Sequence, residues 1–139
     1  MSTPTTFAFL TDLHYGYERR NRHKVPLHDI KAFNTALAFL EDFEPDLLIL
    51  GGDMLDCGAI SHHNKGKPGR TEGLRLLADV EGCRKEILDP LEALGASKQV
   101  YILGNHERWL EDLTDDQPEL EGIADPAHLL KLDPKAWTV

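Results

Sequence analysis

Three short polar motifs carry most of the chemistry that this sequence could perform. They are Asp12-Leu13-His14, Gly52-Asp53 and Gly104-Asn105-His106-Glu107. Carboxylate and amide oxygens and imidazole nitrogens are donors that divalent cations accept in proteins. On an extended backbone Asp12 and His14 would point the same way, so that both could bind one ion. The motifs therefore predict a metal site.

Each motif follows a short apolar run that predicts a buried strand. These strands are Thr6–Leu10, Leu47–Leu50 and Gln99–Leu103. The first is apolar throughout, as a strand buried on both faces should be. Helices are predicted between them, over about His28–Phe43 and Thr71–Leu88, with a kink or restart at Asp89-Pro90. This order predicts an α/β fold whose mainly parallel strands are joined by crossover helices and meet at one ligand-binding edge.

The remaining segments are more polar. Asp12–Pro26 and the Gly-, His- and Lys-rich residues 54–70 are predicted to be loops. From His106 onward the pattern predicts a short helix, an acidic loop and a weak helix near Pro126–Leu132. The final residues, Trp137–Val139, look like a cut made inside or before a strand.

Composition limits the classes of partner. The net charge of −9 argues against a broad nucleic-acid surface, although bound cations would still permit a phosphate substrate. Two basic stretches, Arg19–Lys24 and Lys65–Arg70, either border the site or are solvated loops. Cys57 and Cys83 lack metal-site spacing. With no bilayer-length apolar run and no signal segment, the pattern predicts a cytoplasmic protein with no membrane partner.

The three motifs, taken in this order at strand ends, resemble those of the calcineurin-like metallophosphoesterases: D-x-H, G-D and G-N-H-[DE]. The match covers residues 7–107. It implies an αββα sandwich of two sheets, of which residues 1–139 would encode the N-terminal portion of a single domain. Residues 6–107 carry the motifs and residues 108–139 form an acidic helical and loop tail. It also implies hydrolysis of phosphomonoesters or phosphodiesters by a hydroxide generated between two metals about 3.5–4 Å apart.

The resemblance also implies a role for each residue of the motifs. Asp12, His14 and Asp53 would hold one divalent ion, while Asp53 and Asn105 would begin the site of a second. Mn²⁺ is the favoured metal, although Mg²⁺, Fe and Zn²⁺ also accept such donors. His106 would donate a proton to the leaving group, and Glu107 would orient the His106 imidazole.

Other residues are candidates for contact with the substrate. Arg108 either contacts the phosphate or forms a salt bridge with the acidic segment. His62 and His63 either reach the substrate or a metal, or are ordinary loop histidines. Asp56 is expected to support the loop of Asp53 by hydrogen bonding. The long basic loop after Asp53 resembles phosphoesterases of phages and bacteria, which suggests a nucleotide or nucleic-acid substrate.

The late histidines of the family, an isolated His and then G-H-x-H, are missing, and His128 does not replace them. The chain is therefore interpreted as a truncated enzyme, as one piece of a split enzyme completed by another chain, or as a non-catalytic binding or scaffold module. The intact early motifs count against a degenerate fold that has lost its activity. Half of a sandwich would expose the apolar inner face of its sheet and promote self-association.

Overall fold

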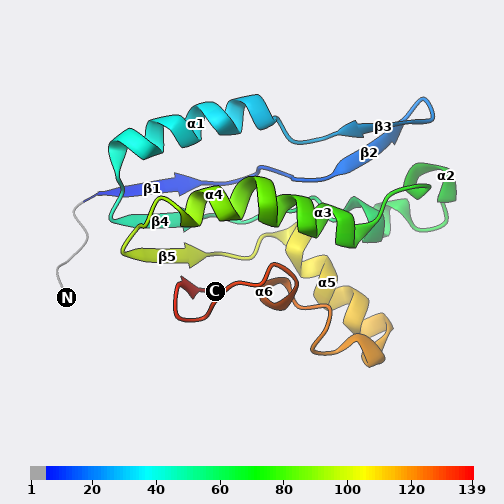
Figure 1. Ribbon diagram of the computed structural model, residues 1–139. Coiled ribbons are helices and arrows are strands. Elements are labelled where there is room, and N and C mark those ends of the chain that lie inside the picture. Colours follow the sequence, from blue (N-terminus) through cyan, green and yellow to red (C-terminus); the bar gives the residue numbers. More distant parts are fainter. Residues whose placement is uncertain (1–5) are drawn as a thin grey trace.

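Four parallel strands, in the order β1-β4-β5-β6, form the main sheet of this computed structural model, which describes residues 6–139. Figure 1 shows α1 and the α3–α4 segment running alongside the strands. The strands are β1 (Phe7–Leu10), β4 (Leu47–Leu50), β5 (Lys98–Tyr101) and β6 (Trp137–Thr138). The predicted α/β class and parallel pairing are confirmed. The third strand ends two residues earlier than predicted, because the chain leaves the sheet to bring Gly104 against Asp53.

The first crossover helix begins later than predicted, and the second crossover is divided into several helices. α1 spans Ile30–Phe43, because the side chain of Asp29 accepts hydrogen bonds from the first backbone N–H groups and caps the helix there. The second crossover contains α2 (Pro68–Thr71), α3 (Leu76–Cys83) and α4 (Asp89–Glu92). A π-helical turn, Arg84–Leu88, joins α3 to α4 ahead of Pro90, a residue that cannot donate to the preceding turn.

An antiparallel hairpin replaces most of the loop predicted over Asp12–Pro26. It consists of β2 (Tyr17–Arg20) and β3 (His23–Pro26). The two turn residues, Asn21 and Arg22, both have positive φ, at 50° and 65°. Such turns usually contain glycine at the second position, and here arginine occupies it. The prediction was therefore wrong for residues 17–26 because the usual sequence signal is missing.

Three 3₁₀ turns lie outside the sheet: η1 (Gly58–Ile60), η2 (His62–Asn64) and η4 (Pro118–Leu120). α5 spans Asn105–Asp116 and α6 spans Pro126–Leu129, so both helices predicted after β5 are present. The final residues, which look in the sequence like a cut made inside or before a strand, contain β6, which pairs with β5. The indole N–H of Trp137 donates to Glu92 at 2.7 Å and ties β6 to α4.

The core lies on one face of the sheet. Strand residues on that face are buried: Ala8, Leu48, Leu50, Gln99, Tyr101 and Trp137. The alternate residues of β1, Phe7 and Phe9, are 64% and 52% exposed, as is Ile102 after β5 at 50%. The expectation that the first strand is buried on both faces was therefore wrong. An open apolar face is instead what the interpretation as half of a sandwich anticipates.

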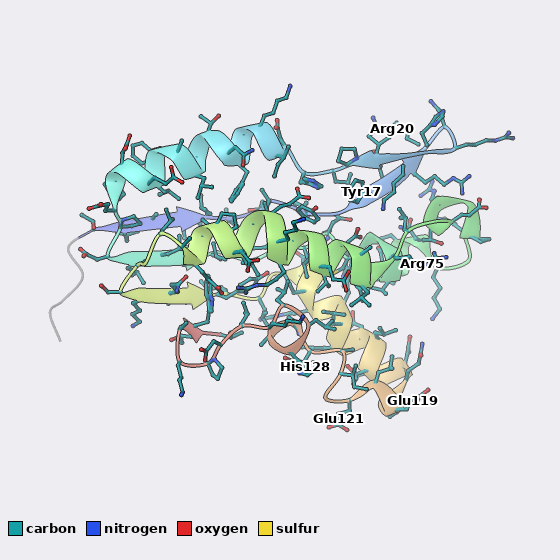
Figure 2. The ribbon with its side chains drawn as sticks, in the orientation of Figure 1. Tyr17, Arg20, Arg75, Glu119, Glu121 and His128 are labelled. Carbon is teal, nitrogen blue, oxygen red and sulfur yellow. The ribbon has the colours of Figure 1, made fainter. Side chains whose placement is uncertain are left out.

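Charge is unevenly distributed over the molecule. Figure 2 shows Arg20 on the hairpin and Arg75 at the start of α3, whereas Glu119 and Glu121 lie beyond the end of α5. Arg19 in β2 forms an ion pair with Glu72, which follows α2. The two basic stretches of the sequence therefore lie side by side. No helix within residues 6–139 is long and apolar enough to cross a membrane.

Candidate metal centre

The loops that follow β1 and β4 continue to pair beyond the strands. The backbone N–H of Gly51 donates to the carbonyl of Leu10 at 2.7 Å, and that of Asp12 donates to Gly52 at 3.1 Å. The N–H of His14 then donates to the carbonyl of Asp53 at 2.8 Å. These hydrogen bonds hold the first two motifs together at the carboxyl edge of the sheet, as the sequence predicted.

The backbone at these motifs is not extended. Asp12, His14 and Asp53 have φ values of 55°, 50° and 52°, in the left-handed region that side chains other than glycine rarely adopt. The expectation that an extended backbone aligns Asp12 with His14 was therefore wrong. Such strained residues cluster at functional sites, where surrounding structure holds them. Here the paired loops supply that constraint.

Three of the predicted ligands come together as a donor set. Ligand atoms of Asp12, His14 and Asp53 lie within 4.8 Å of one another. Nε2 of His14 is 3.8 Å from Oδ1 of Asp12, and Asp12 is largely exposed. Two carboxylates and one imidazole at the rim of a sheet suit a hard or borderline divalent cation.

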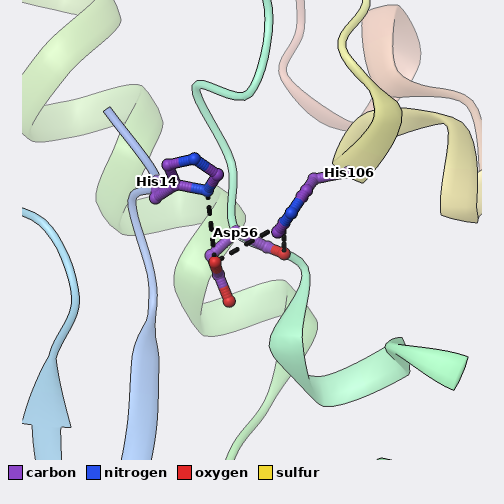
Figure 3. Close-up of side chains that lie close together, drawn as sticks. All are labelled: His14, Asp56 and His106. Atoms are coloured by element: carbon purple, nitrogen blue, oxygen red, sulfur yellow. Dashed lines mark hydrogen bonds and ion pairs between the residues drawn. The ribbon is translucent and has the colours of Figure 1, made fainter. Parts of the chain in front are cut away.

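Asp56 lies between two histidines (Figure 3). Its Oδ1 is 3.3 Å from Nδ1 of His14 and 3.5 Å from Nδ1 of His106. A carboxylate on Nδ1 favours a proton there and leaves Nε2 of His14 as the nitrogen available to a cation. These three residues form a second group with metal-ligand spacing. The sequence suggested only a loop-supporting role for Asp56, because its contacts depend on the folded path of three separate segments.

His106 is fixed by contacts on several sides. Its backbone N–H donates to Oδ1 of Asp53 at 2.9 Å, and its Nδ1 lies 2.6 Å from the carbonyl oxygen of Asp56. A carbonyl can only accept, so this contact assigns a proton to Nδ1. The imidazole meets His14 edge-on, with ring centroids 4.6 Å apart. It also stacks on Trp109 at 4.1 Å.

Glu107 differs most from its predicted role. Its carboxylate is completely buried and accepts five hydrogen bonds. The donors are the backbone N–H groups of Asp53, Met54, Leu55 and Gly104 and the hydroxyl of Tyr101. None of these donors is the imidazole of His106: three are backbone N–H groups at or just after the second motif, and the other two are the N–H of Gly104 and the hydroxyl of Tyr101. Glu107 therefore holds the Asp53 loop, and Asp56 occupies the position expected for Glu107 beside the imidazole.

The other predicted site residues lie around this cluster. Asn105 is exposed at the first position of α5, and its amide has no hydrogen-bond partner within residues 6–139. Arg108 is exposed on the same helix, and the salt bridge to the acidic segment, one of its two predicted roles, is absent among the residues described. His62 and His63 contact Trp109, with ring centroids 5.4 Å and 5.8 Å away.

Trp109 was missed from the sequence. It follows the third motif on a helix, where an aromatic residue usually serves packing, so its position carried no distinct signal. In the structure it joins the two histidines of η2 to His106. His62 and His63 are therefore separated from the donor set by the indole ring.

Three buried side chains, those of Asp79, Cys57 and Cys83, have pKa values raised above their ordinary values. Burial raises the pKa of Asp79 from 3.8 to about 6, with Lys24 lowering it and Asp56 raising it. Burial also raises the pKa of the thiols of Cys57 and Cys83, which are both free. Neither cysteine belongs to the groups with metal-ligand spacing found among residues 6–139.

Comparison with known proteins gives two matches. The sequence model of a family described as calcineurin-like phosphoesterase matches residues 5–134. Gene 54 protein of Mycobacterium phage L5 is 27% identical to this chain over 85 residues, which cover 61% of this chain and 33% of the phage protein. The matched region thus spans about a third of the length of that relative.

Proposed function

Because the chain belongs to the calcineurin-like phosphoesterase family, we propose that it binds divalent cations and hydrolyses phosphomonoester or phosphodiester bonds. The observation that carries this proposal is the donor set of Asp12, His14 and Asp53, whose ligand atoms lie within 4.8 Å of one another. His106 lies directly beside that set, and its backbone N–H donates a hydrogen bond to the Asp53 carboxylate.

The residues present fit a cation by their chemistry. Asp12, His14 and Asp53 would hold one ion, and Asp53 with the exposed amide of Asn105 would contribute to a second. When bound, such ions neutralise charge on the phosphoryl oxygens and lower the pKa of water. Mn²⁺ is the metal we propose, because it accepts mixed oxygen and imidazole donors.

His106 would deliver the proton to the leaving oxygen. Its Nδ1 is occupied by the carbonyl of Asp56, so Nε2 is the nitrogen that faces no partner among residues 6–139. A leaving alkoxide needs a proton, and the imidazolium form of His106 would carry one at Nε2 in addition to the proton that Nδ1 donates to Asp56; its transfer to the leaving oxygen would return the neutral ring. Stacking on Trp109 limits rotation of the ring and keeps Nε2 in one direction.

Arg108 is the nearby cation proposed for the phosphate. It lies on the same helix as Asn105 and His106, and its guanidinium has no ion pair in the described part of the chain. A free guanidinium can contact two phosphate oxygens at once. The acidic residues of α5 form no ion pair with the Arg108 guanidinium in the described part of the chain.

The test uses two substrates and one conservative variant. Hydrolysis of p-nitrophenyl phosphate and bis-p-nitrophenyl phosphate is followed with Mn²⁺, and Mn²⁺ binding is measured separately by electron paramagnetic resonance. Asp53→Asn keeps an oxygen for the N–H of His106 but removes the charge. We expect it to weaken Mn²⁺ binding at least about tenfold and to abolish hydrolysis. The ratio of the two rates assigns monoesters or diesters.

Asp115→Asn is the matched control, because Asp115 is exposed on α5 and makes no ion pair among residues 6–139. It should leave binding and hydrolysis unchanged. Hydrolysis that survives in Asp53→Asn would contradict the site. Tight Mn²⁺ binding with neither substrate hydrolysed would contradict the enzymatic proposal and favour a binding module or a piece needing another chain.

A further inference from the structure

A cavity of about 550 Å³ lies beside the candidate catalytic histidine. Trp109, on which the His106 ring stacks, forms part of its wall. The η1–η2 segment and α5 supply most of the remaining lining, including Ser61, His62 and Gln117. The same indole ring therefore contacts His106 and borders the cavity, so a group attached to an oxygen at His106 would reach the cavity by passing around that ring.

We propose that this cavity binds the nucleoside portion of a phosphate-ester substrate, the portion that departs with the oxygen protonated by His106. The assignment of the cavity to the leaving group rests on the proposed phosphoesterase function. The cavity itself is argued from its own lining.

Its aromatic walls suit a planar ring. Trp109 and His62 both line the cavity, with their rings edge to face at 5.4 Å. Nucleobases stack on such side chains, and they do so whatever the base. A volume of about 550 Å³ also falls within the range of small-molecule sites.

The charges of the lining cancel. Two lysines, Lys65 and Lys67, and two aspartates, Asp112 and Asp116, line the cavity, and Nζ of Lys65 is 3.7 Å from Oδ2 of Asp116. A balanced lining of this kind gives no net attraction to a further phosphate. The amide of Gln117 has no partner among residues 6–139 and offers a donor and an acceptor. The ligand that matches is uncharged, aromatic and polar at its edge, as a nucleoside is.

The same helix argues against a long nucleic acid. Glu111, Asp112, Asp115 and Asp116 make the outer part of α5 acidic, and the whole chain carries a net charge of −9. A strand that continued past the cavity would bring its phosphates against these carboxylates. We therefore assign the cavity to a single nucleoside at the end of the substrate.

The test measures binding without metal and without catalysis. Adenosine and guanosine are titrated into the chain while tryptophan fluorescence is recorded, because Trp109 lines the cavity and the other tryptophan, Trp137, is buried in β6. We expect saturable quenching by both nucleosides and none by ribose. Calorimetry should show that Trp109→Leu loses about tenfold in affinity, whereas Trp109→Phe stays within about threefold.

Two further variants make the result decisive. Asp115→Asn lies on α5 outside the cavity and should bind nucleosides as the parent does. His62 is exposed, so His62→Ala should leave folding intact. It should weaken nucleoside binding, and it replaces Trp109→Leu in the test if that variant does not fold. Equal quenching by ribose, or full affinity in both cavity variants, would overturn the proposal. Hydrolysis of bis-p-nitrophenyl phosphate without nucleoside binding refutes the cavity assignment alone. Nucleoside binding without any ester hydrolysis refutes the phosphoesterase function instead.

Discussion

The buried carboxylate of Glu107 accepts a hydrogen bond from the backbone N–H of Asp53 at 2.8 Å. The same Oε2 accepts from the N–H of Gly104 at 2.9 Å, and Oε1 accepts from Met54 at 2.7 Å. One side chain on α5 therefore ties the loop after β4 to the loop after β5. The left-handed conformation of Asp53 depends on this tie, since the backbone donors on either side of the turn converge on it.

Glu107→Gln should destabilise the protein without changing the size of the side chain. Its amide nitrogen would face two backbone N–H groups where Oε2 now accepts from them. Loss of two charge-assisted hydrogen bonds in a buried site should lower the free energy of unfolding by about 2–4 kcal/mol. Urea denaturation measures the change. Glu111→Gln, exposed on the same helix, should stay within about 0.5 kcal/mol, and an equal effect of both variants would refute this role of Glu107.

Gly104→Ala tests the close approach of the second and third motifs. An added Cβ would lie 2.2 Å from Oδ1 of Asp53 and 2.4 Å from its backbone nitrogen, so the loops must separate. We expect a loss of about 2–4 kcal/mol in unfolding free energy together with weaker Mn²⁺ binding. Gly69→Ala in α2 is the control, because a Cβ there meets nothing within 4 Å. Neutral behaviour of Gly104→Ala would mean that the two motifs are not in contact.

The sequence predicted those elements whose ends are marked by local chemistry. β4 matches residue for residue, because Pro45 precedes it and the pair Gly51-Gly52 follows. The hairpin was missed, because Asn21 and Arg22 adopt positive φ through strand pairing and the turn contains no glycine that would have indicated it. Local propensity could not reveal a turn that depends on the pairing of its two strands.

The residues of the site likewise divide into those that the sequence could identify and those that it could not. Asp12, His14 and Asp53 could be identified because each follows a strand, and parallel strands end at one edge. The exchange of places between Glu107 and Asp56 could not be predicted, since it depends on which way α5 leaves Gly104. Trp109 likewise gains its role only from the fold of the η1–η2 segment against α5.

Asp79 should make the stability of the protein fall as the pH rises. Its side chain is 1% exposed, Oδ1 has no hydrogen-bond partner among residues 6–139, and burial raises its pKa from 3.8 to about 6. Between these two values the folded protein binds more protons than the unfolded chain, so ionisation of Asp79 costs stability. The cost should reach about 3 kcal/mol above pH 6.

Asp79→Asn should remove this dependence. Urea denaturation of both proteins across about pH 4 to pH 7 should show the variant gaining stability relative to the parent as the pH rises. Lys24 and Asp56, the charged groups that act on Asp79, are unchanged in the variant. Parallel stability curves would contradict the buried, neutral state of Asp79 at low pH. Asp115→Asn is the control, because Asp115 is exposed. The exposed Asp89 in α4 is unsuitable, because it forms an ion pair with Arg84.

The open face of the sheet should drive self-association. Phe7 and Phe9 in β1 and Ile102 after β5 are at least half exposed, and apolar patches of this kind seldom remain in water. Phe7→Glu would place a charge in that face and should shift the chain toward monomer in sedimentation velocity. Leu77→Glu is the matched control, because Leu77 is 60% exposed but lies on α3, outside the sheet. Association that persists in Phe7→Glu but not in Leu77→Glu would assign the contact to the helices, and a monomeric parent chain would refute the prediction outright.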